Sequence, residues 1–134
     1  MANWKRLTFL MAVVILLTAW AQTPALSGPL EDGQAAEKQQ DFQTALKLWQ
    51  PLADQGNAEA QYDIGAMYYY GQGVPQDNVQ AYMWFSLAVE KAGNKKFMAK
   101  DRDAVAETMT PEHLAEAKRL ASEWKPTSAQ TSAP

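Results

Sequence analysis

A pattern that recurs after 36 residues constrains this chain more than any other feature. Asp41 to Asn57 and Asp77 to Gly93 superpose at that shift, so that Trp49 falls on Phe85. In both segments the apolar residues recur at the three- and four-residue spacing of an amphipathic helix. A repeat of this length with helical units is typical of stacked helix pairs.

Further helical segments complete the pattern. Partner helices are expected at about Leu30–Gln40 and at Ala58–Tyr70, and two more helices at Lys95–Met109 and Pro111–Trp124. The sequence offers no strand-like alternation of useful length. It therefore predicts an all-α fold of about three antiparallel helix pairs, which is about the minimum for a stack to bury a continuous core.

The glycine-rich run from Tyr68 to Asp77, YYYGQGVPQD, is predicted to join two helices. Gly71 follows the apolar face of one helix and can adopt the left-handed conformation that ends it. Pro75 favours extended geometry at the residue before it, and Asp77 can cap the next helix. A phosphate-binding loop would need a preceding strand and a Lys-Ser/Thr pair after the glycines, and the sequence has neither.

Residues 58–93 resemble a Sel-one-like repeat. The residues that carry the resemblance are Ala60, Ile64, Gly65, Tyr68, Gly71, Gly73, Val74, Pro75, Asp77, Ala81, Trp84, Phe85 and Ala88. The segment before them resembles the degenerate first unit of such arrays, and MTPEHLAEAKRLASEW resembles the closing helix of bacterial members. The resemblance implies a right-handed α-solenoid related to tetratricopeptide repeats. It also implies an adaptor or scaffold that works through protein–protein contact.

The N-terminus has the pattern of a secretory signal peptide. Lys5 and Arg6 precede an almost wholly apolar run that ends in the small-x-small site Ala19-Trp20-Ala21. Cleavage after Ala21 predicts a periplasmic or secreted protein that meets the membrane only through its signal peptide. The alternative is an uncleaved membrane anchor, although the run is shorter than the about 20 apolar residues that span a bilayer.

The chain divides into four predicted regions. They are a signal peptide (1–21), a linker rich in Pro, Ser and Gly (22–29), an α-helical repeat domain (30–125) and a disordered tail (126–134). Within the domain we expect a degenerate first repeat (30–57), a full repeat (58–93) and a C-terminal capping helix pair (94–125).

Charge and composition argue against several functions. Cleavage after Ala21 would remove two of the 12 basic residues and none of the 15 acidic ones, leaving a net charge of −5. Nucleic-acid binders normally carry a basic balance, so we expect no nucleic-acid partner. The chain has no cysteine, whereas the secreted relatives linked to β-lactam binding are cysteine-rich. We therefore do not extend β-lactam binding from those relatives to this chain.

The chain shows no catalytic or metal-binding pattern. His113 is the only histidine, and it falls in a first helical turn, where solvation is the simpler explanation. Without cysteine or a second histidine the common metal-ligand sets fail. No nucleophile–base pair is visible. We expect a protein that is not an enzyme and has no catalytic residue, metal or cofactor.

Two surfaces are candidates for binding. On Ala58–Tyr70 the face opposite the expected core, together with the following loop, supplies the partner-binding candidates Glu59, Tyr62, Asp63, Ala66, Tyr69, Tyr70 and Gln72. Tyrosine suits a binding groove because it offers rigid contact area with a polar tip. The alternative is that these tyrosines pack on the neighbouring helix pair. The second surface is the basic stretch from Lys91 to Arg102, which can also be a solvated face.

The function that fits best is an exported, non-enzymatic adaptor that binds another protein or an extended peptide. The alternative is a cell-wall glycan (peptidoglycan) binding module, in which Tyr69 and Tyr70 would stack on sugar rings. A β-lactam-type hydrolase ranks last because the chain shows no catalytic pair.

Overall fold

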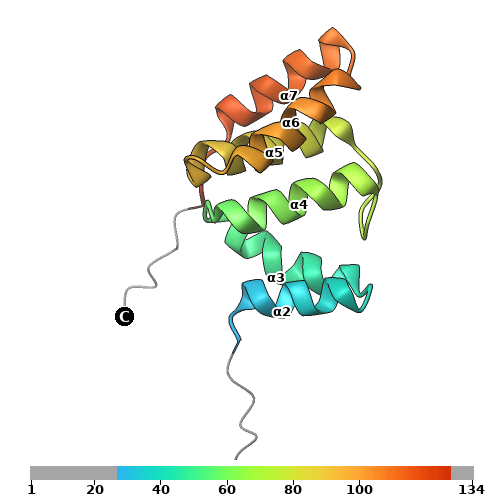
Figure 1. The fold of residues 1–134 in the computed structure, drawn as a ribbon, viewed down its shortest axis with the longest axis vertical. Helices are drawn as coiled ribbons and strands as arrows, with labels where there is room; N and C mark the ends of the chain where they lie inside the picture. The colour runs from blue at the N-terminus through green and yellow to red at the C-terminus, as the bar shows by residue number, and fades with distance from the viewer. Residues whose placement is uncertain (1–26, 128–134) are drawn as a thin grey trace, which may run out of the picture.

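The computed structural model describes residues 27–127. The predicted signal peptide, residues 22–26 of the linker and residues 128–134 of the tail lie outside the described part. Within it the chain forms six helices and no strand: α2 (Pro29–Lys38), α3 (Phe42–Asp54), α4 (Ala58–Tyr70), α5 (Asn78–Ala92), α6 (Lys96–Glu107) and α7 (Pro111–Glu123). Figure 1 shows them stacked in order from α2 at the bottom to α7 at the top. The predicted all-α solenoid is confirmed.

Side-chain caps explain where several helices begin. Asp77 Oδ1 accepts hydrogen bonds from the backbone N–H groups of Val79 and Gln80, at 2.9 and 3.1 Å. Thr110 caps α7 in the same way, as predicted. Gly71 closes α4 with a φ of 66°, which confirms the left-handed C-cap. Helix α2 begins at Pro29, one residue before its predicted start, because proline at the first helical position needs no N–H partner.

One core cluster joins α2 to α5 around Trp49. This side chain is fully buried and contributes to a cluster with Ile64, Met67 and Trp84. Its indole N–H donates to the carbonyl oxygen of Leu30 at 3.1 Å, which satisfies the only polar atom of the ring. The contact fixes α2 on α3, although α2 is short and polar by itself.

A second cluster joins α5 to the last two helices. Phe85 is 3% exposed and packs in a cluster with Val105 of α6 and Ala117 of α7. Gly65 allows this ring to approach α4, since a Cβ atom there would lie 2.7 Å from Cδ1 of Phe85. Both α6 and α7 therefore dock on α5 and extend the stack.

No helix among residues 27–127 combines the length and the apolar character that crossing a membrane requires.

Candidate functional site

Tyr62 lies at the centre of the surface formed by α4 and α6. Its ring centroid is 5.2 Å from that of Phe85 and 5.4 Å from that of Phe97, the second contact being edge-on. Its hydroxyl donates to Asp101 Oδ2 at 2.5 Å. Burial and this hydrogen bond raise the pKa of Tyr62, so the phenol keeps its proton at neutral pH. Tyr62 is thus fixed between two helices, with a hollow on each side.

The first hollow, here called the tyrosine hollow, has a volume of about 190 Å³. It is lined by Tyr62, Ala66, Tyr69, Tyr70, Phe85, Asp101, Ala104 and Val105. The rings of Tyr69 and Tyr70 meet edge-on with centroids 4.9 Å apart. Tyr70 is 67% exposed, so one wall of the hollow is a tyrosine that projects into solvent.

The second hollow, here called the acidic hollow, has a volume of about 240 Å³. It is lined by Gln34, Glu59, Tyr62, Asp63, Lys95, Phe97 and Met98. Lys95 Nζ pairs with Glu59 Oε1 at 2.7 Å, and Phe97 is 52% exposed.

Asp63 is the most unusual group of the acidic hollow. Its Oδ2 atom is buried and has no hydrogen-bond partner among the residues that the structure describes. Burial raises the pKa of the carboxyl to about 7, and the nearby charges of Glu37 and Glu59 act in the same direction. The site therefore holds a carboxyl group that a neighbouring cation would stabilise in its charged form.

Six of the seven predicted partner-binding residues line one of these hollows. They are Glu59, Tyr62, Asp63, Ala66, Tyr69 and Tyr70. Gln72 lines neither, because the chain turns at Gly71 and the backbone N–H of Gln72 bonds back to the carbonyl of Met67. Tyr62 also shows the alternative packing, since its ring contacts both α5 and α6.

The structure adds side chains that the sequence did not single out. Phe97, Asp101 and Ala104 of α6 form the opposite walls, and Gln34 comes from α2. The apolar spacing of α6 predicted that this segment is a helix, but not against which other helix it would pack. The available signal for a binding surface was Phe97, an aromatic residue at the start of a polar helix.

The predicted basic stretch is divided by ion pairs. Lys95 is bound to Glu59, and Arg102 pairs with Asp103 at 2.6 Å. Lys91, Lys96 and Lys100 are exposed. Part of the positive charge is therefore balanced within the chain, and binding through this stretch stays a prediction.

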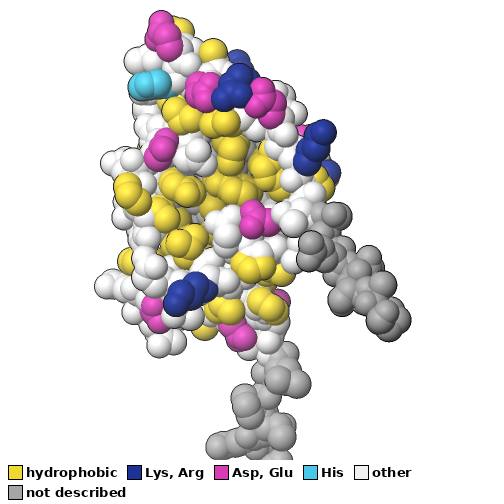
Figure 2. Space-filling model, turned by 180° about the vertical axis from the view of Figure 1, so that it is seen from behind, with side chains coloured by type: hydrophobic (Ala, Val, Ile, Leu, Met, Phe, Trp, Pro, Cys, Tyr) yellow, Lys and Arg dark blue, Asp and Glu magenta, His cyan; other side chains and the backbone are white. Residues whose placement is uncertain are grey.

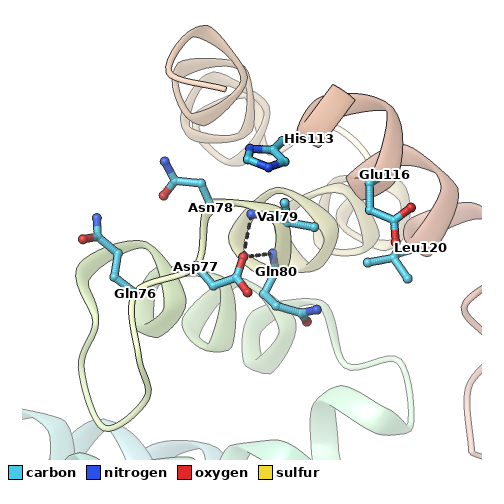
Figure 3. Close-up of a pocket in the computed structure, with 8 residues that line it drawn as sticks. All are labelled: Gln76, Asp77, Asn78, Val79, Gln80, His113, Glu116 and Leu120. Atoms are coloured by element: carbon cyan, nitrogen blue, oxygen red, sulfur yellow. Dashed lines mark hydrogen bonds between the residues drawn. The ribbon is translucent and has the colours of Figure 1, made fainter. Parts of the chain in front are cut away.

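A wider hollow, of about 690 Å³, lies between the start of α5 and α7 (Figure 3). Asp77 and Glu116 are its acidic residues. Asp77 is engaged in capping α5, and Glu116 binds Arg119 at 2.7 Å. His113 is exposed at its edge. This hollow is larger than the other two, but no Tyr, Phe or Trp lines it, whereas the α4–α6 surface carries the exposed rings of Tyr70 and Phe97, so we favour the α4–α6 surface.

The face turned away from the viewer in Figure 1 is also rich in hydrophobic side chains, which gather at its centre in Figure 2. Within residues 27–127 no group of three or more His, Cys, Asp or Glu side chains has an arrangement that could hold a metal ion.

Comparisons with known proteins agree on one family. The family model described as Sel1 repeat matches residues 28–57 and 58–92. The human protein sel-1 homolog 2 is 40% identical over 62 residues, 46% of this chain and 9% of that protein. HRD3A of Arabidopsis thaliana, an ERAD-associated E3 ubiquitin-protein ligase component, is 41% identical over 56 residues, 41% of this chain and 8% of that protein. The chain thus spans less than a tenth of these relatives.

A solved structure shares the fold. The protective antigen c5321 of uropathogenic Escherichia coli, which displays an SLR fold, superposes with a TM-score of 0.67 at 30% sequence identity. The match covers 72% of this chain and 21% of that one.

Proposed function

Because this chain is a Sel1-repeat protein with two repeats, we propose that it is an exported, non-enzymatic adaptor that binds another protein or an extended peptide on its α4–α6 surface. Two lines of support come from similarity. Similarity to Sel1 repeats implies a scaffold for protein interactions, and the similar plant protein HRD3A is an ERAD-associated E3 ubiquitin-protein ligase component. Export, with a periplasmic location, is proposed from the signal-like N-terminal sequence alone.

The observation that carries the proposal is the exposure of Tyr70 beside the tyrosine hollow. A tyrosine that is 67% exposed and stands next to a hollow supplies rigid contact area at low entropic cost. Interface hot spots are enriched in tyrosine for this reason. The hollow of about 190 Å³ is smaller than a usual small-molecule pocket of about 300–1,000 Å³, so it suits one side chain of a larger partner.

We expect Tyr70→Ala to weaken partner binding at least about tenfold, since a tyrosine hot spot contributes about 2 kcal/mol or more. Affinity purification of the tagged chain from the cells that produce it identifies the bound partner. Titration with the purified partner then measures the affinity. Tyr70 is mostly exposed, so the variant should stay folded. Tyr62 is less suitable for truncation, because its ring packs between Phe85 and Phe97.

His113→Ala is the matched control, because this exposed residue lines the wider hollow of Figure 3. Loss of binding in the His113 variant with full binding in the Tyr70 variant would place the interface on α7 and contradict the proposal. Retention of the chain by purified cell wall, with no protein captured, would favour the glycan alternative instead.

A further inference from the structure

We infer that the acidic hollow is the binding site for one cationic side chain, a lysine or arginine of the bound peptide. This inference rests on the proposed function and names the chemistry of the partner. It draws on the walls of the hollow, its charge, its size and the cation that the chain itself places there.

Two aromatic rings form walls of the hollow. Tyr62 and Phe97 meet edge-on with centroids 5.4 Å apart, and Phe97 is 52% exposed. A cation within about 6 Å of an aromatic face is attracted by the ring quadrupole. The aliphatic stem of a lysine or arginine would also cover the exposed ring of Phe97.

The carboxylates supply the complementary charge. Glu59 and Asp63 line the hollow, and Glu37 of α2 is close enough to affect Asp63. Lys95 is the one basic residue in the lining, and Glu59 binds it. Asp63 has a buried oxygen that no described residue satisfies, a condition that costs free energy. An incoming cation beside this carboxyl would stabilise its ionised form.

Lys95 shows that the hollow accepts an ammonium group. Its Nζ lies 2.7 Å from Glu59, although both side chains are 39–49% exposed. Exposed pairs of this kind contribute little to stability, so a ligand can displace Lys95 from Glu59. With a volume of about 240 Å³ the hollow holds one long side chain rather than a whole small molecule.

The two hollows share Tyr62 as a wall. A peptide that places a basic side chain in the acidic hollow would therefore set a nearby side chain against Tyr69 and Tyr70. The preferred partner is thus a segment that combines a lysine or arginine with a neighbouring apolar or aromatic residue.

The test follows the carboxyl carbon of Asp63 by NMR in the full chain during a pH titration. The probes are N-acetyl-lysine N-methylamide and its uncharged counterpart, N-acetyl-norleucine N-methylamide. The lysine amide should lower the pKa of Asp63 from about 7 and shift the ring signals of Phe97. A drop of about one pKa unit means that the ionised carboxyl binds the probe about tenfold better. The norleucine amide should leave the pKa of Asp63 unchanged.

Two variants sharpen the test. Asp63→Asn should abolish the preference of the Phe97 signals for the lysine amide over the norleucine amide. Lys95→Met should keep or increase the response of Asp63, because it removes a competing cation. Equal responses to both probes, or none at Asp63 and Phe97, would overturn the inference. Neither result would affect the Tyr70-dependent capture, whereas failure of that capture alone would contradict the proposed function.

Discussion

Replacement of Trp49 by alanine is expected to lower the free energy of unfolding by about 3–5 kcal/mol. The side chain is completely buried in the cluster that joins α2, α3, α4 and α5. Its removal leaves a cavity that rigid helices can only partly close. It also removes the N–H that bonds to the carbonyl of Leu30. Since a domain of this size is stabilised by about 5–15 kcal/mol, the variant should retain little of its stability.

Urea denaturation followed by far-ultraviolet circular dichroism measures this loss. Lys47→Ala, on the exposed side of the same helix, is the control and should change the free energy by no more than about 0.5 kcal/mol. A loss below about 1 kcal/mol for Trp49→Ala would mean that α2 does not depend on this contact.

The stability of the wild type is expected to fall between about pH 4 and pH 7 because of Asp63. The folded-state pKa of about 7 lies above the ordinary value of 3.8, so the folded chain holds this proton more tightly than the unfolded chain. The resulting stabilisation is complete below the unfolded value and is lost as the pH rises through the folded value. The charged groups around this carboxyl are Glu37 and Glu59, which act on its pKa, and Lys95, which lines the same hollow. Asp101 accepts a hydrogen bond from the neighbouring Tyr62.

Asp63→Asn removes this proton uptake. A pKa difference of this size corresponds to at most about 4 kcal/mol, and partial exposure of the side chain reduces it to roughly 2 kcal/mol. The variant should therefore match the wild type near pH 4 and be more stable by roughly 2 kcal/mol near pH 8. Thermal unfolding at both pH values measures the difference. Glu107→Gln, at the exposed end of α6, is the control. An Asp63→Asn effect that is the same at both pH values would contradict the assignment.

The sequence predicts the helices well because their ends are local. Asp77, Thr110 and Gly71 act on residues within a few positions of themselves, and each adopts the predicted role. The 36-residue shift likewise predicts the stacking, since equivalent buried positions such as Trp49 and Phe85 follow from periodicity.

Contacts between distant segments were not predictable in the same way. Gly33 lowers the helix propensity of α2 considered as an isolated helix. A side chain at this position, however, would collide with the indole ring of Trp49. No local signal connects these two residues. The glycine is therefore explained by the packing of α2 on α3, and its cost in helix propensity is offset there.

The candidate site likewise combines features that the sequence predicts with features that it does not predict. Tyr62, Ala66 and Tyr69 share a face of α4 because of their helical spacing, and the sequence shows this directly. Phe97 and Asp101 complete the hollows only because α6 docks on α5 beside them. The sequence alone placed Phe97 within a basic stretch and gave no reason to pair it with α4.

The most direct test of the α4–α6 surface is a hydrogen-exchange footprint of the captured partner on the chain. We predict that slowed exchange concentrates in the C-terminal half of α4 and in α6, the helices that carry Tyr70 and Phe97. Protection confined to α3, α5 and α7, with α4 and α6 unchanged, would contradict the proposal and move the interface to the face seen in Figure 2.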